Sequence, residues 1–507
     1  MLMVHQAGRR VVAAGRVREH TIPVEERGRT LRARYVRASR LRLWDASCKP
    51  AVMFGCSFDY TQLGGPLPGP EPVSVCDVLC PPTNVPGLAG QVDQLEEEYT
   101  PMSVETPRPS RFVGLDVHKH YLVAYALDAD LNRLFGPQRV PMDDLEAWRQ
   151  KCLTPQDAVV LEMTTNALQL HDDLLPHVHS VTVVHPPHVT AITRGRVMTD
   201  KIASRILATY LAKELLVSIW VPPQPVRELR ALLAQRSKMV RLSTQAENRL
   251  HAVLHRHRLL PPRGSPFLDA AREWWLGLPV DPLERTRIQA DLDTLAFAQR
   301  QIAALEECLA TAAAQDERVP FLVQTTGISM LTALTLLAAI GDIKRFPSAR
   351  HLVGYAGLGA SVHDSGQSHR EGRITKAGRR DMRAALVEAA QTAANTHSHW
   401  RSELKRLEPR LGRNKAIVAI ARNLLVVVWH TLTEETADRH ADAERVARKL
   451  MQHAYKLGRA NRGPGQTTAQ YVREQLDRLG LGQELKGIPW GKRFIALPPS
   501  GLDASRQ

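Results

Sequence analysis

The stretch that decides the fold is FVGLDVHKHYLVAYALD, residues 112–128. Two apolar runs flank a short polar segment, which predicts a strand, a tight turn and a second strand. A further apolar run, AVVLEM at residues 158–163, predicts a buried strand followed by a helix to residue 175. SVTVVHPP at residues 180–187 predicts another strand. Strands that alternate with helices favour an α/β layered fold.

Length and charge limit the classes of protein to consider. The 507 residues exceed what one compact core holds, so several domains are expected. A net charge of +15 favours a polyanionic partner, nucleic acid first, although a basic balance can also serve solubility alone.

The most apolar stretch, residues 416–429, is interrupted by Arg422 and Asn423, and no membrane span is predicted. Six cysteines indicate no disulfide framework, so we expect a reducing, cytoplasmic setting.

Changes in composition divide the chain into five parts. We expect an extension at 1–108, a ribonuclease-H-like domain at 109–220, a helical and coiled-coil-like region at 221–315, a mostly helical serine-bearing domain at 316–435, and a polar helical tail at 436–507. The extension holds eleven Arg and no Lys before residue 45, then a Pro/Gly-rich stretch, both typical of disorder. Its cysteines at 48, 56, 76 and 80 are spaced too loosely for a zinc site. Met102 is an alternative start.

Three carboxylates stand where the predicted sheet would bring them together. Asp116 lies within the first strand, Glu162 ends the strand AVVLE, and Asp200 lies near the start of a predicted helix. Carboxylates are poor strand residues and are seldom buried without a partner. Together they would form an oxygen-rich cage for Mg²⁺, and a pair of such ions can support cleavage of a phosphodiester. The alternative is that each is a surface residue near a strand end.

A glycine turn precedes a very apolar segment. QTTGISMLTALTLLAAIGDIKRF, residues 324–346, predicts a turn at Gly327 and a helix that ends at Gly341. The backbone N–H groups at Gly327 are candidates for holding a phosphate. Plain helix packing explains the same pattern equally well.

The segment GYAGLGASVHDSGQSHREGRITKAGRRDMRAALVEAA, residues 354–390, combines a serine with many cations. We expect Ser365 and Gly366 in a polar loop. Basic residues follow closely: Arg370, Arg373, Lys376, Arg379, Arg380 and Arg383. Arg379 and Arg383 share a helix face, which is unfavourable without a counter-ion such as phosphate. A serine in this field could attack phosphorus, because the cations would stabilise the developing charge.

Two other interpretations of the Asp-Ser-Gly sequence remain. One is a simple turn. The other is a serine protease, which we set aside because no strand-rich barrel surrounds the serine and the basic cluster suits phosphate better than a peptide carbonyl.

Taken together, these motifs resemble the insertion-sequence transposases that combine an Asp-Glu-Asp-Asp metal set in a ribonuclease-H-like domain with a serine-bearing domain. Some members are bridge-RNA-guided recombinases. The resemblance covers residues 111–457 and rests on motifs in family order. These are GLDVHK, VVLEMT, TDKIASRILA, AENRLHAVLHR, GISMLTALTLLAAIGDIKRFPSARHLVGYAGL, DSG, GRITKAGRRDMRAALVEAA and ARNLLVVVWHTLT.

The resemblance implies roles for individual residues. Asp116, Glu162 and Asp200 match the first three metal carboxylates, and Ser365 matches the nucleophile. The fourth carboxylate, three residues after the third, is replaced by Ala203, which predicts weaker binding of a second ion. Met198 stands where a lysine is common, and residues 164–165 are Thr-Thr where the family has Thr-Gly.

The implied function is DNA strand exchange at insertion-sequence ends, through a serine–DNA intermediate assisted by Mg²⁺. A homo-oligomer and a structured guide RNA are implied partners. The basic helical stretch 227–257 is a candidate for holding that RNA or the DNA backbone.

Two alternatives stand beside this interpretation. The chain could be a catalytically impaired transposase that still binds nucleic acid, as Ala203 suggests, or a metal-only, structure-selective nuclease in which Ser365 is a turn residue.

Overall fold

The computed structural model describes residues 19–26, 29–36, 108–186, 199–365 and 368–502. The chain forms two compact units, Met1–Val73 and Ser74–Gln507. In the first unit, β1 (Glu19–Glu26) and β2 (Arg29–Val36) pair antiparallel. This pair lies within the segment expected as an extension. The cysteines at 48, 56, 76 and 80, and Met102, lie outside the described residues.

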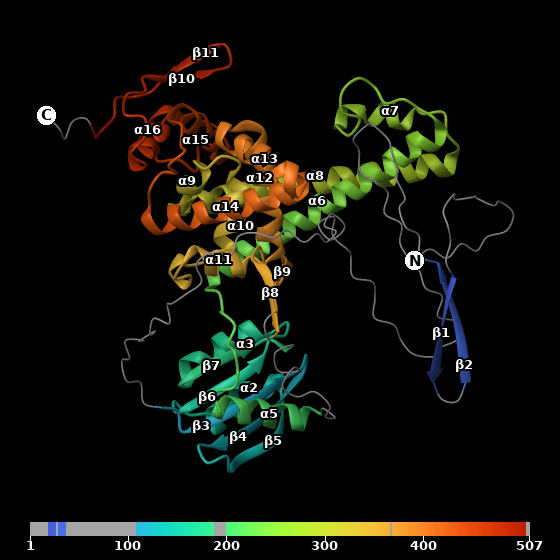
Figure 1. Ribbon diagram of the computed structural model, residues 1–507, viewed down its shortest axis with the longest axis vertical. Coiled ribbons are helices and arrows are strands. Elements are labelled where there is room, and N and C mark those ends of the chain that lie inside the picture. Colours follow the sequence, from blue (N-terminus) through green and yellow to red (C-terminus); the bar gives the residue numbers. More distant parts are fainter. Residues whose placement is uncertain (1–18, 27–28, 37–107, 187–198, 366–367, 503–507) are drawn as a thin grey trace. The chain divides into compact units, whose positions relative to one another are not determined.

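A five-stranded sheet opens the second unit. Its order is β5 (Arg133–Pro141), β4 (Tyr121–Asp128), β3 (Arg111–Val117), β6 (Asp157–Glu162) and β7 (Ser180–Val184). The first three strands run antiparallel to one another, while β6 and β7 run parallel to β3. The predicted strands are therefore observed, and this order is consistent with a ribonuclease-H-like transposase domain (Figure 1).

Alternation along β3 separates two layers of packing. Val113, Leu115 and Val117 are buried in a cluster that also takes in the helices α2 (Leu145–Cys152) and α3 (Ala167–Leu174). The alternate positions, Gly114 and Asp116, belong to the opposite face of the sheet. The helix α5 (Asp200–Ala212) covers that face (Figure 1). The sheet thus has helices on both faces, and the predicted carboxylate Asp116 lies on the face of α5.

Two long helices form the middle region. α6 (Gln224–His257) and α8 (Pro282–Gln315) pack against each other, with α7 (Arg272–Leu276) beside them. Their ion pairs run in opposite directions along the two helices, so the helices are antiparallel. The pairs are Arg236–Glu306, Arg249–Asp291 and Arg256–Glu284, at 2.6, 2.6 and 2.5 Å. Leu250, Ile288 and Trp275 are fully buried between them. The region expected to be helical and coiled-coil-like thus contains two long helices packed antiparallel.

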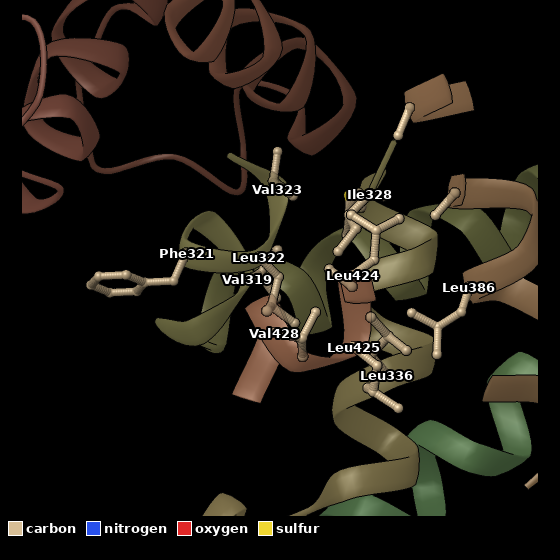
Figure 2. Close-up of a cluster of buried hydrophobic side chains, with 14 of the residues drawn as sticks. Val319, Phe321, Leu322, Val323, Ile328, Leu336, Leu386, Leu424, Leu425 and Val428 are labelled. Carbon is tan, nitrogen blue, oxygen red and sulfur yellow. The ribbon is translucent and has the colours of Figure 1, made fainter. Parts of the chain in front are cut away.

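The serine-bearing region is mostly helical. Its helices are α9 (Arg318–Val323), α10 (Met330–Ile340), α11 (Ala349–Tyr355), α12 (Arg380–Thr396), α13 (Ser398–Leu411) and α14 (Arg413–Glu434). Figure 2 shows how Leu424, Leu425 and Val428 of α14 gather with apolar side chains of the preceding helices. One hairpin, β8 (Ala360–Ser365) and β9 (Ser368–Ile374), interrupts the helices. Short 3-10 turns occur at Met142–Asp144, Leu175–His177, Asp269–Ala271 and Ile343–Arg345.

The C-terminal part joins the same core and is not a separate polar tail. It contains α15 (Ala443–Leu457), α16 (Thr468–Arg478), β10 (Gly487–Trp490) and β11 (Arg493–Ala496). Leu450 and Met451 of α15 and Val472 of α16 are fully buried in the core of the serine-bearing region. The burial of this part could not be predicted from its average composition, which is polar, because α15 has its apolar residues on one helix face.

Among the described residues, α14 is the helix long and apolar enough to cross a membrane by length and composition. Half of its most apolar window is buried, and Ile420, Leu424 and Leu425 are fully buried in the protein core. Its apolar character is therefore explained by packing inside the protein.

Candidate active site

Two carboxylates converge because α5 lies directly on β3. A side chain at Gly114 would place its Cβ 2.1 Å from the carbonyl oxygen of Ser204 and 2.5 Å from the amide nitrogen of Ala208. Only glycine allows this approach of the α5 backbone. Asp200 is the first residue of α5, and Asp116 lies two residues after Gly114 on the same face of the sheet. The close contact therefore sets the distance between Asp116 and Asp200.

The residues Asp116, His118 and Asp200 form a group of possible metal ligands. One ligand atom from each lies within 4.8 Å of the others. The His118 Nε2 atom is 3.5 Å from Asp116 Oδ2 and 3.4 Å from Asp200 Oδ2. The site is half-open, with the Asp116 side chain 21% exposed and the Asp200 side chain 43% exposed. These three residues could hold one divalent cation.

Glu162 lies beside Asp116 and outside this group of three. In the parallel register Leu115 pairs with Leu161, so Asp116 and Glu162 follow side by side on neighbouring strands. Burial raises the pKa of Glu162, and the negative charge of Asp116 raises it further. The structure thus brings the three predicted carboxylates into one region, with Asp116 and Asp200 closest to a shared centre.

The charged form of the Asp116 carboxyl group is disfavoured in this site. Burial raises its pKa, His118 opposes this rise, and the nearby Asp200 adds to it. Two carboxylates that face each other in a partly buried site repel unless a cation lies between them. A divalent cation would remove this repulsion, so the electrostatics of the site fit a metal.

His118 and Tyr121 also belong to this site, although neither was predicted from the sequence. The Tyr121 hydroxyl donates a hydrogen bond of 3.0 Å to Asp200 Oδ2, which raises the pKa of Tyr121. The His118 and Tyr121 rings stack with their centroids 4.7 Å apart, and the Arg139 guanidinium lies 3.8 Å from the Tyr121 ring centre. A usable signal existed for His118, because it lies two residues after Asp116 and alternation places it on the same side.

The residues expected near the fourth carboxylate offer no substitute for it. Ala203 lies one turn after Asp200 on α5 and is half-buried. Ser204 is fully buried, and its hydroxyl donates to the Lys201 carbonyl at 3.3 Å within the same helix. The Ser204 hydroxyl is therefore used inside α5. Met198 lies outside the described residues.

Ser365 lies at the end of a strand and not in a polar loop. It is exposed, closes β8, and pairs with Ser368 of β9 across the hairpin. Gly366 lies outside the described residues. The strand before Ser365 contains two apolar residues, Ala360 and Val362, which is too weak a pattern to separate a strand from a loop. The far end of the hairpin is held by Ile374, which packs against the core of the serine-bearing region.

The basic residues after Ser365 are placed differently from the prediction. Arg370 and Arg373 belong to β9, and Lys376 follows with a left-handed backbone, φ 55°. Arg373 and Arg380 are exposed. Arg379 pairs with Asp381 at 2.5 Å, and Arg383 donates to the carbonyls of Ala356 and Gly378 at 3.0 and 3.1 Å. The protein thus supplies acceptors for Arg379 and Arg383, and contact of either residue with a nucleic-acid phosphate stays a prediction.

The turn at Gly327 is a packing contact. Gly327 has φ 91°, and a Cβ there would lie 2.2 Å from the carbonyl oxygen of Ala389 in α12. Lys449 of α15 donates to the carbonyl oxygens of Thr325 and Ile328 on either side of Gly327, at 3.0 Å for Ile328. Glycine is needed at position 327 because the backbone has a positive φ and because α12 approaches it closely. Helix packing explains both features. A phosphate at the Gly327 N–H group remains a prediction.

Replacing Lys449 with methionine is expected to remove a pH dependence of stability. Burial lowers the pKa of Lys449 from 10.5 to about 7. Between these values the unfolded state holds a proton that the folded state lacks, so the wild-type free energy of unfolding rises with pH. Between about pH 7 and about pH 9, urea unfolding should show the wild type gaining about 1–2 kcal/mol relative to the variant. Parallel curves would mean that the ammonium stays charged between its carbonyl acceptors.

Two parts of the chain match domains of known transposases. Residues 113–258 match the transposase domain designated DEDD_Tnp_IS110. Residues 320–405 match the domain described as Transposase IS116/IS110/IS902 family. The first match holds the sheet, α5 and α6, and the second holds α9 to α12 with the serine hairpin.

Several curated relatives are similar over a large part of the chain. A pilin gene-inverting protein of Moraxella bovis is 29% identical over 268 residues, which are 51% of this chain and 74% of the relative. The transposase for insertion sequence element IS1111A of Coxiella burnetii is 26% identical over 223 residues, 41% of this chain and 59% of the relative. A probable family 20 transposase of Pseudomonas aeruginosa is 23% identical over 341 residues, 64% of this chain and 98% of the relative.

Proposed function

Because the chain carries both domains of the IS110/IS116 family of transposases, we propose that it cleaves and rejoins DNA strands at insertion-sequence ends through Ser365. The observation that carries this proposal is the convergence of Asp116 and Asp200, which α5 brings to one face of the sheet. A pilin gene-inverting relative and transposase relatives support DNA rearrangement as the class of reaction.

The carboxylate site has a defined part in this proposal. Asp116, Asp200 and the neighbouring Glu162 would hold a divalent cation, with Mg²⁺ as the ion that the family resemblance implies. Bound there, the cation would supply Lewis acidity toward a phosphate oxygen. Asp116 and Asp200 would fix its position because their backbones are held together at Gly114.

The reaction at Ser365 is a phosphoryl transfer. A bond forms from Ser365 Oγ to phosphorus while the bond from phosphorus to the leaving sugar oxygen breaks. The hydroxyl proton passes to a base, and the leaving oxygen takes up a proton. Exposed Arg373 and Arg380 would attract the DNA backbone and offset the negative charge of the transition state. Rejoining reverses these steps with a different strand.

Partners follow from the same proposal. The DNA of element ends and target would bind along the basic residues of β9, the turn after it and the start of α12, including Arg370, Lys376, Arg379 and Arg383. A structured guide RNA and the DNA backbone are both candidates for α6, whose sequence is rich in Arg and His. We also propose a homo-oligomer, since strand exchange joins two DNA partners and requires more than one cleaving serine.

The test is a covalent-adduct assay with the full chain, its own flanking DNA and Mg²⁺ or Mn²⁺. A protein–DNA species that survives denaturing electrophoresis is the expected result. Cleavage without any adduct would favour the metal-only nuclease. Salt-dependent DNA binding without cleavage would favour the impaired transposase.

Replacing Ala203 with aspartate is expected to raise adduct formation in Mg²⁺ several-fold. The new carboxylate would stand one helical turn after Asp200, on the same face of α5, and would add an oxygen ligand. Adduct yield at limiting Mg²⁺ measures the effect. The matched control is Thr209→Asp, which adds the same charge to α5 two turns farther along. A gain in both variants, or in neither, would contradict a missing ligand at position 203.

A further inference from the structure

We propose that His118 Nε2 is a direct metal ligand that takes the place of the carboxylate missing at Ala203, and that this ligand makes the site favour Mn²⁺ over Mg²⁺. This inference rests on the metal site proposed above and goes beyond it, because it assigns a nitrogen ligand and a metal preference.

The distances fit coordination. His118 Nε2 lies 3.5 Å from Asp116 Oδ2 and 3.4 Å from Asp200 Oδ2. Ligands that share one ion at about 2.0–2.2 Å are separated from each other by about 3–3.5 Å. The Nε2 atom is therefore spaced from each of the two carboxylate oxygens like a neighbouring position around one ion, and all three atoms lie within 4.8 Å of one another.

The polar neighbours of the nitrogen are the two carboxylates. Among the described residues, His118 Nε2 is buried and makes no hydrogen bond. A buried polar atom without a partner is costly, and functional sites are where such atoms gather. A cation between the three atoms satisfies all of them at once.

The orientation of the ring is fixed from outside the site. Tyr121 stacks on the His118 ring, and its hydroxyl holds Asp200 Oδ2, the same oxygen that faces Nε2. Arg139 lies against the Tyr121 ring. One aromatic residue thus orients two of the three ligand atoms, as residues around metal ligands commonly do. Tyr121 is a positioning residue in this arrangement.

The ligand chemistry sets the metal preference. Mg²⁺ prefers an all-oxygen shell, whereas a site with an imidazole nitrogen binds divalent transition ions, among which Mn²⁺ binds most weakly. Ala203 removes an oxygen ligand from the family pattern, and His118 adds a nitrogen. The resulting set of two carboxylates and one imidazole is therefore expected to discriminate against Mg²⁺.

The experiment is metal titration of the full chain without DNA, using Mn²⁺ and Mg²⁺ separately in a calorimeter. The wild type should bind Mn²⁺ at least about tenfold more tightly than Mg²⁺. The variant His118→Ala should lose at least about tenfold in Mn²⁺ affinity while Mg²⁺ affinity changes by less than about twofold. The matched control His120→Ala alters an exposed histidine two residues away and should leave both affinities unchanged.

A second variant and a spectroscopic readout guard against a folding defect. His118→Asp restores an all-oxygen set and should reverse the preference toward Mg²⁺. Pulsed electron paramagnetic resonance on the Mn²⁺ complex should show coupling to an imidazole nitrogen in the wild type and in His120→Ala, and none in His118→Ala.

Three results would overturn the inference. They are unchanged Mn²⁺ affinity in His118→Ala, absence of nitrogen coupling in the wild type, and equal affinity of the wild type for both ions. The second result would mean that His118 is an imidazolium held by the carboxylates. Metal binding is measured here without DNA, so failure of the serine chemistry would show separately, as loss of the adduct with intact Mn²⁺ binding.

Discussion

Alanine at position 365 is expected to abolish the covalent protein–DNA adduct and to lower strand cleavage by about a thousandfold or more. The variant removes the only atom that can form the proposed bond to phosphorus, while the exposed position of Ser365 leaves the hairpin intact. Metal binding should not change, because Ser365 belongs to the hairpin of the serine-bearing region. Denaturing electrophoresis of labelled DNA measures both the adduct and the cleaved strand.

The matched control is Ser368→Ala. Ser368 pairs directly with Ser365 across the hairpin, so the control makes the same chemical change in the opposite strand. It should retain the adduct. Normal cleavage by Ser365→Ala, combined with loss of cleavage in Asp116→Ala, would instead establish a metal-only nuclease. An adduct that persists in Ser365→Ala would assign the nucleophile to another residue.

Alanine at position 114 is expected to destabilise the sheet domain by about 3 kcal/mol or more and to abolish Mn²⁺ binding. The new Cβ would lie 2.1 and 2.5 Å from backbone atoms of Ser204 and Ala208, which cannot rotate away as a flexible side chain would. The α5 helix must therefore shift. Asp200 begins that helix, so the shift separates it from Asp116.

Thermal unfolding and Mn²⁺ titration measure the two effects. Gly354→Ala is the matched control, since a Cβ at Gly354 meets nothing within 4 Å. It should leave stability and Mn²⁺ binding close to the wild type. Retained Mn²⁺ affinity in a folded Gly114→Ala protein would show that the α5 contact does not set the separation of the two carboxylates.

Local pattern predicted much of this protein. The strands β3, β4, β6 and β7 were found from short apolar runs, because alternation and burial leave a signal within a few residues. The start of α5 near Asp200 and the helical character of the region that holds α6 and α8 were also predicted. The carboxylates stood out because Asp and Glu are rare at buried strand positions.

Local sequence patterns could not predict contacts between distant parts of the chain. Tertiary structure decided that Arg383 donates to the Ala356 carbonyl, and that Lys449 contacts the turn at Gly327. It also placed α15 in the core of the serine-bearing region, although the composition of that segment is polar. Average composition cannot show which face of a helix is covered, because that depends on the neighbour it meets.

The sequence by itself determined the sheet, the long helices, the carboxylates and the serine with its basic surroundings, since each is written in local periodicity or residue type. Only the tertiary structure decided that Ser365 closes a strand, and that His118 faces Asp116 and Asp200 with Tyr121 behind it. The physical reason is that α5 reaches β3 only where Gly114 leaves room. That contact depends on backbone packing between segments far apart in the chain, which no local pattern records.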